Sequence, residues 1–159
     1  MKVAIYARSL QTLQPSLIDN FFEQLSYYNF QFILHDQFKA DLKREYGLGL
    51  EGVEDFSSDE DLGQRQVKAL LSLGGDGTLL DTLQLVKDSN IPVMGINTGR
   101  LGFLANIPRE EIGLALHALK EGHYTTEPRG LLQLINPPPS LENGPFALND
   151  FVVQKRDFS

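Results

Sequence analysis

The chain has 159 residues, of which 42% are apolar and 22% charged, and this is the composition of one ordinary globular domain. It contains no cysteine, which excludes disulfides, thiolate metal sites and cysteine nucleophiles. Fourteen basic residues against 21 acidic ones give a net charge of −7, so we expect no nucleic acid and no anionic membrane as partner. The apolar run before Arg8 is too short for a signal peptide or a membrane span. These features together predict a cytoplasmic protein.

The first 61 residues predict strands and helices in alternation. Residues 2–7 and 30–34 have the composition of buried strands. Apolar side chains recur at helical spacing after Pro15 and again across 36–46. Residues 51–61 carry six acids and no base, which indicates a solvated loop.

The alternation continues in the next 60 residues. Residues 67–73 form an almost unbroken apolar run, typical of a central strand in a parallel sheet. Helical spacing resumes at Leu79, residues 91–96 predict another strand, and a helix is expected from Pro108 to Lys120 with Gly122 as its stop. The order predicts an α/β domain at 1–122 with a doubly wound, mostly parallel sheet of the Rossmann or flavodoxin type.

The pattern changes after Gly122. Two strands, 124–135 and 146–155, are expected with only proline-, asparagine- and glycine-rich turns between them. Two strands do not form a stable domain alone. Residues 123–159 are therefore interpreted as the beginning of a β-rich second domain, and the chain as a truncated part of a longer protein.

One glycine motif is set aside because of its context. Residues 47–52, Gly-Leu-Gly-Leu-Glu-Gly, fit the G-x-G-x-x-G dinucleotide pattern. That pattern works where a strand leads into the glycines and a helix begins from them. Here the glycines follow a charged helix and lead into the acidic segment, so we expect no nucleotide at this site.

The run Gly74-Gly75-Asp76-Gly77-Thr78 has the required context, because a buried strand leads into it and a helix follows. Gly74, Gly75 and Gly77 lack Cβ atoms, so phosphate oxygens can approach backbone N–H groups there. A carboxylate at 76 repels phosphate unless it does acid–base work or faces a cation, which indicates phosphoryl transfer. The alternative is a plain turn, with Thr78 and Asp81 forming only a capping box.

A second glycine-rich turn, Asn-Thr-Gly-Arg-Leu-Gly-Phe-Leu-Ala at 97–105, follows the strand at 91–96. Two such loops on neighbouring strands can face each other at one edge of the sheet. The alternative is that Phe103 and Leu104 belong to the core and that Arg100 is a solvated charge, which is the reading we prefer for Arg100.

Three motifs in this order resemble the ATP-dependent NAD kinases: GGDGT at 74–78, N-T-G-x-L-G-F-L at 97–104 and A-L-N-D at 147–150. The resemblance extends from the first strand to the last. It implies that Asp76 is the base for the 2′-hydroxyl of the adenosine ribose and that Asn149 and Asp150 hold ribose hydroxyls of NAD. The other nucleotide-binding positions that we expect are Gly74, Gly75, Gly77, Thr78, Leu80, Asn97, Gly99, Phe103 and Leu104, with adenine against Leu80, Phe103 and Leu104.

The sequence departs from this family in three ways. Many members carry a basic residue soon after GGDGT, whereas Asp81 and Asp88 flank the helix here, so help with phosphate charge must come from elsewhere. Asp150 stands where many members have glutamate. The glycine- and threonine-rich stretch of the family's second domain does not occur, and we therefore expect the 159-residue chain alone to be inactive.

The resemblance implies transfer of the γ-phosphoryl group of ATP to NAD, giving NADP. Mg²⁺ is the expected cofactor, accompanying ATP, because few basic residues are available to neutralise phosphate charge. No metal-binding residues of the chain itself are predicted, and polyphosphate remains an alternative donor. The full-length protein is expected to be a homo-oligomer.

Two other functions remain open. A diacylglycerol- or sphingosine-type lipid kinase uses a related GGDGT turn, but it leaves the motifs at 97–104 and 147–150 unexplained. A non-catalytic flavodoxin-like or receiver-type binding module is the second alternative. A receiver needs paired acids at the end of its first strand, where this chain has Tyr6-Ala7-Arg8.

Overall fold

The computed structural model describes residues 1–99, 102–138, 146–148 and 150–152. It separates the chain into two compact units, Met1–Thr126 and Glu127–Ser159. Within the described residues the first unit contains β1 (Lys2–Tyr6), η1 (Leu10–Thr12), α1 (Pro15–Tyr27), β2 (Gln31–His35), α2 (Asp36–Tyr46), β3 (Asp55–Phe56), α3 (Asp59–Gln64), β4 (Ala69–Leu73), α4 (Asp76–Asp81), α5 (Leu83–Val86), β5 (Val93–Asn97), β6 (Ile107–Pro108), η2 (Arg109–Glu111) and α6 (Ile112–Glu121).

The strands of the first unit form one sheet in the order β3-β2-β1-β4-β5-β6, and every neighbouring pair is parallel. This confirms the predicted doubly wound α/β fold. The chain builds outward from β1 to β3 and then returns to build outward from β4 to β6. The order therefore reverses between β1 and β4, and in open α/β sheets ligands bind at the carboxyl ends of the strands beside such a reversal.

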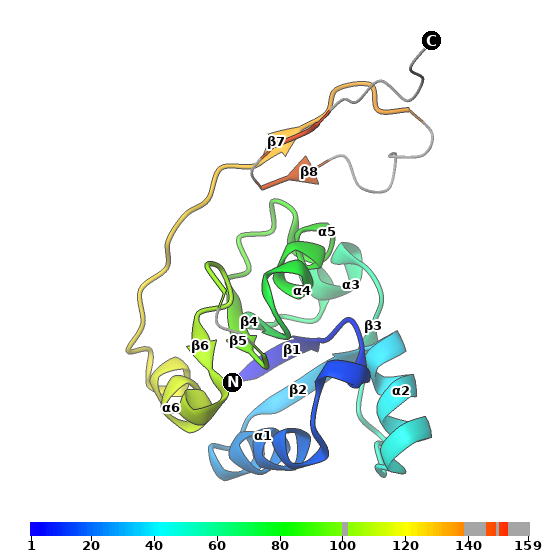
Figure 1. Ribbon diagram of the computed structural model, residues 1–159, viewed down its shortest axis with the longest axis vertical. Coiled ribbons are helices and arrows are strands. Elements are labelled where there is room, and N and C mark those ends of the chain that lie inside the picture. The colour runs from blue at the N-terminus through cyan, green and yellow to red at the C-terminus, as the bar shows by residue number, and fades with distance from the viewer. Residues whose placement is uncertain (100–101, 139–145, 149, 153–159) are drawn as a thin grey trace. The chain divides into compact units, whose positions relative to one another are not determined.

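Helices cover both faces of this sheet, with α1, α2 and α6 on one side and α3, α4 and α5 on the other (Figure 1). Because side chains alternate along a strand, each central strand supplies both cores. In β1, Val3 and Ile5 pack in the cluster that includes Phe21 and Leu116, whereas Ala4 packs in the opposite cluster with Phe56. The near-continuous apolar sequence of β4 follows from this, since all five of its residues are buried.

Two local predictions were confirmed, the helix at 36–46 and the helix stop at Gly122. The helix expected at 36–46 is α2, and it ends on Gly47 in the left-handed conformation, with φ of 61°. Helix α6 ends on Gly122, with φ of 74°. Glycine adopts this conformation without the strain that a Cβ introduces, which is why both helices stop there.

The acidic segment at 51–61 was wrongly predicted to be only a solvated loop. It contains β3, which pairs with β2, and the start of α3. Phe56 is 1% exposed, and its packing in the core holds the segment against the sheet. The acids dominate the local composition, but one aromatic side chain provides the apolar contact that holds the edge strand.

The second unit contains two short antiparallel strands among its described residues, β7 (Leu132–Gln133) and β8 (Phe146–Ala147), with Leu132 opposite Ala147. The long strand expected at 124–135 is wrong outside β7, because residues 124–131 form no regular element. Of the expected second strand at 146–155, only β8 is a strand among the described residues, because 148 and 150–152 form no regular element. Asn149 and residues 153–155 lie outside the described residues. In the described residues no helix is both long enough and apolar enough to cross a membrane.

Candidate functional site

The predicted glycine-rich loop lies at the carboxyl end of the central strand β4. Gly74 N–H donates to the carbonyl of Ile96 in β5 at 3.0 Å, which fixes the start of the loop to the neighbouring strand. Gly74 has a φ of 155°, and a Cβ added there would lie 2.2 Å from Thr78 Oγ1. Glycine is therefore required at 74 by both conformation and space.

Helix α4 begins at Asp76 in this loop, and Gly75 is its N-cap without a side-chain hydrogen bond. The N–H groups of Thr78 and Leu79 donate to Gly75 O at 3.0 and 3.1 Å. The capping box proposed as the alternative for Thr78 and Asp81 is wrong, because Thr78 lies inside the helix and the Asp81 carboxylate accepts from Tyr6 and Arg8.

The Asp76 side chain crosses to the second glycine-rich turn. Its Oδ1 accepts from the N–H groups of Leu104 and Ala105, and its Oδ2 accepts from Phe103 N–H, each at 2.9 Å. Hydrogen bonds from the backbone N–H groups of Ala105, Phe103 and Leu104 lower the pKa of Asp76 below its ordinary value of 3.8. Asp76 is therefore ionised at neutral pH and binds the two loops together.

Gly102 makes this bridge possible. A Cβ at position 102 would lie 2.1 Å from Asp76 Oδ1, so any other residue would displace the carboxylate. The expectation that the two glycine-rich loops face each other is met at this contact. An ionised carboxylate offers about four lone-pair positions. Three accept the backbone N–H groups, which leaves room on Oδ2 for one further donor.

Asn97 has a structural position in the same turn. Its side chain is 3% exposed, its Nδ2 donates to Ala105 O at 3.1 Å, and its Oδ1 accepts from Gly99 N–H at 2.8 Å. These bonds close the turn between β5 and β6. The buried Asn97 amide therefore holds the backbone of the loop, and it does not face solvent.

The other predicted nucleotide-binding residues differ in exposure. Phe103 is 97% exposed, so the alternative that places it in the core is wrong. Gly77 and Gly99 are exposed as well, whereas Leu80 and Leu104 are half-buried. Asp150 is exposed in the second unit, and Asn149 and Arg100 lie outside the described residues.

A further cluster adjoins the loop and was not among the predicted site residues. Arg8 follows β1, and its Nη2 donates to Gly77 O at 3.0 Å while its guanidinium pairs with Asp81. Tyr6 OH also donates to Asp81, at 3.1 Å. Burial, with the Asp81 charge beside it, raises the pKa of Tyr6 to about 12, which keeps this hydroxyl a donor. The sequence signal that could have identified this cluster is Arg8, a basic residue just after the first parallel strand.

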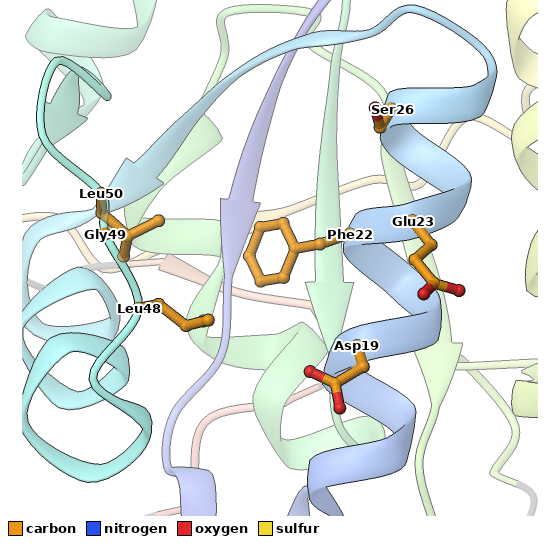
Figure 2. A pocket seen from close by; sticks show the side chains of 7 residues that line it. All are labelled: Asp19, Phe22, Glu23, Ser26, Leu48, Gly49 and Leu50. Carbon is orange, nitrogen blue, oxygen red and sulfur yellow. The ribbon is translucent and has the colours of Figure 1, made fainter.

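A separate hollow of about 470 Å³ lies between α1 and the segment after α2 (Figure 2). Asp19, Phe22, Glu23 and Ser26 line it from the helix, and 48–50 line it from the other side. Gly49 of the G-x-G-x-x-G motif is therefore here, away from the carboxyl end of β4. The lining has two acids and no base, which does not suit a pyrophosphate.

Comparison with known proteins identifies the family. Residues 18–124 match the family model described as the ATP-NAD kinase N-terminal domain. The chain is 35% identical over 159 residues to the NAD kinase of Bacteroides fragilis, covering the whole chain and 53% of that protein. It is 45% identical over 104 residues to the NAD kinase of Cytophaga hutchinsonii, covering 65% of the chain and 35% of that protein.

The fold has a solved counterpart in yeast NADH kinase complexed with NADH, with a TM-score of 0.60 at 19% identity, covering 84% of this chain and 40% of the yeast chain. The chain spans about half the length of the curated relatives that it matches over its full length. The family match covers most of the first unit, including both glycine-rich loops joined by Asp76. The chain therefore belongs to the NAD kinase family, and it carries the N-terminal domain of that family.

Proposed function

We propose that the full-length protein is an NAD kinase, a transferase that moves the γ-phosphoryl group of ATP to the 2′-hydroxyl of the adenosine ribose of NAD and forms NADP. The observation that carries the proposal is the bridge from Asp76 to the backbone of 103–105. It joins the family's two glycine-rich motifs at the carboxyl ends of β4 and β5. The NAD kinases found as relatives and the NADH bound to the yeast structure support NAD as the substrate.

In this proposal Asp76 accepts the proton of the ribose hydroxyl. The remaining acceptor position on Oδ2 can take a hydrogen bond from that hydroxyl. Because three N–H groups stabilise the ionised form, the carboxylate is a weak base in the resting site. The proton therefore transfers as the new O–P bond forms and the hydroxyl becomes acidic, with the pair of electrons of its O–H bond remaining on the attacking oxygen. The bond between the γ-phosphorus and the β,γ-bridging oxygen breaks in the same step, and its electron pair leaves with ADP.

The loop residues would bind the nucleotides around this carboxylate. Gly75, Gly77 and Thr78 offer backbone and hydroxyl groups beside Asp76, and Gly99 lies exposed in the opposite turn. Phe103, with its ring in solvent, and the half-buried Leu80 and Leu104 would provide the apolar surface for adenine. From the family resemblance, Asn149 and Asp150 are proposed to hold ribose hydroxyls of NAD.

Mg²⁺ is proposed to enter with ATP, since phosphoryl transfer needs neutralised phosphate charge. The described residues contain no group of three or more His, Cys, Asp or Glu that could hold a metal ion. Asp76 and Asp81 are already engaged by N–H groups and by Arg8. We propose that the ion is carried by the phosphates of the donor.

Four further attributes belong to the proposal. A cytoplasmic location is part of the proposal. The product implies a role in NADP biosynthesis. A homo-oligomeric state and the use of polyphosphate as an alternative donor remain expectations for the full-length protein.

The test is direct. The full-length protein is incubated with ATP, Mg²⁺ and NAD, and NADP is followed with an NADP-specific dehydrogenase. ATP-dependent NADP formation is the expected result. A matched reaction with diacylglycerol and sphingosine as acceptors tests the lipid kinase alternative. Phosphorylation of lipid without NADP formation would overturn the proposal.

A further inference from the structure

Arg8 bridges the two strands at which the order of the sheet reverses. It follows β1, whereas the Gly74–Thr78 loop follows the neighbouring strand β4. Its Nη2 donates to Gly77 O at 3.0 Å. The guanidinium therefore lies at the position where open α/β sheets bind their ligands, directly beside the loop that contains Asp76.

The orientation of Arg8 is fixed by Asp81 in the same helix as Asp76. Nε and Nη2 each donate to a different oxygen of the Asp81 carboxylate, both at 2.5 Å. Tyr6 OH donates to the same carboxylate at 3.1 Å. A two-point pair of this kind sets the plane of the guanidinium, which a lysine ammonium in the same place would not do.

The third nitrogen of Arg8 is left available. Nη1 carries two N–H donors and has no hydrogen-bond partner among the described residues. A Cβ added to Gly77 would lie 3.5 Å from Nη1, so this nitrogen faces the glycine loop. The Arg8 side chain is 58% exposed. Two oriented donors therefore remain unused beside Gly77, on a side chain that is more than half exposed.

A phosphate group at this loop needs such a cation. The chain has a net charge of −7, and Asp76 and Asp81 add negative charge next to the glycines. The bonds from 103–105 stabilise the charge of Asp76 but do not remove it. The two N–H groups of Nη1 point in different directions, so each can donate to a separate phosphate oxygen while the positive charge of the guanidinium attracts the phosphate.

We propose that Arg8 binds phosphate oxygens of a nucleotide held at the Gly74–Thr78 loop, with Asp81 as the residue that positions it. This inference rests on the proposed function. The phosphate belongs either to the phosphoryl donor or to the pyrophosphate of NAD. Both present the same chemistry, and kinetics with the two substrates distinguishes them.

The test compares Arg8→Met and Arg8→Lys with the unaltered full-length protein, varying ATP and NAD separately. Loss of a charge-assisted hydrogen bond should raise the KM of one substrate by about ten- to a hundredfold in Arg8→Met. The substrate whose KM rises is the one whose phosphate Arg8 binds. Arg8→Lys should recover part of the loss, because it keeps the charge but not the two-point geometry.

Arg44→Met is the matched control. Arg44 is 64% exposed and also pairs with a nearby carboxylate, that of Asp41, but it lies on α2. Its KM values should equal those of the unaltered protein. Thermal unfolding is measured for each variant, and if Arg8→Met does not fold, Arg8→Lys alone provides the comparison.

The outcomes separate the two claims. If the unaltered protein forms no NADP, the proposed function fails. If it forms NADP and a folded Arg8 variant keeps both KM values within twofold, the role of Arg8 is overturned while the proposed function stands. A purely structural role would lower the unfolding temperature of the Arg8 variants and leave both KM values unchanged.

Discussion

Asp76 Oδ1 accepts a hydrogen bond from the backbone N–H of Ala105, 29 residues further along the chain. This contact connects the first turn of α4 with the turn that leads from β5 to β6. Two glycine-rich loops that are separate in the sequence thus form one structural unit at the edge of the sheet.

The space at Gly102 provides a first prediction. Gly102→Ala places a methyl 2.1 Å from Asp76 Oδ1 and should displace the carboxylate from its N–H donors. We expect a loss of roughly 1–3 kcal/mol in the free energy of unfolding, measured with urea. Gly99→Ala in the same turn is the control, since a Cβ there meets nothing within 4 Å. Equal stability of the two variants would contradict the bridge.

The pH dependence of stability tests the state of the Asp76 carboxylate. Its pKa is lowered from 3.8 in the folded chain by the N–H groups of 103–105. A lowered folded pKa means that the stabilisation is fully present above the unfolded pKa and is lost as pH falls through the folded pKa. The urea midpoint of the unaltered protein should therefore exceed that of Asp76→Asn by a constant amount from pH 7 to about 5, and the gap should close below 3.8.

Asp88→Asn controls for the change in net charge, because Asp88 is exposed and makes no hydrogen bond among the described residues. A gap for Asp76→Asn that stays unchanged down to acidic pH would show that the carboxylate does not hold the turn in its ionised form.

The discarded glycine motif provides a negative prediction. Gly49 lines the hollow beside Asp19 and Glu23, and a Cβ there would meet only the flexible end of Glu51, at 3.2 Å. Gly49→Ala should leave the NAD affinity of the full-length protein unchanged in a calorimetric titration. A tenfold weaker Kd, about 1.4 kcal/mol, with folding intact would mean that this loop takes part in binding.

The length of the chain relative to its relatives provides another prediction. Residues 1–159 cover 53% of the Bacteroides fragilis NAD kinase, and the activity that we propose is that of a protein of full length, in which all positioning groups act together. The 159-residue chain alone should form little or no NADP from ATP, Mg²⁺ and NAD. Turnover near the ordinary enzyme value of about 10 s⁻¹ would contradict this.

Periodicity predicted most of the first unit because its signals are local. The apolar run that became β4 and the helix at 36–46 each carry their own pattern. The prediction of a solvated loop at 51–61 was wrong because the burial of Phe56 depends on pairing with β2, which is distant in the sequence. The expected strand at 124–135 failed for a related reason, since pairing partners decide how far a strand extends.

The site was predictable in its residues but not in its bonds. Glycine spacing and the strand before it identified the loop at 74–78. No local pattern could show that Asp76 accepts three N–H groups or that Arg8 reaches Gly77. Each contact joins segments that follow two different strands of the sheet. The sheet order, which brings β1 next to β4, was the missing information.

The kcat of Asp76→Asn in the full-length protein tests the central claim most directly. Asparagine with its oxygen in the Oδ1 position can keep the bonds from Leu104 and Ala105, but it cannot take a proton. We predict that kcat falls by about 10²- to 10⁴-fold while the calorimetric Kd for NAD changes only a few-fold. A kcat within a few-fold of the unaltered protein would contradict the account and remove Asp76 from the chemistry.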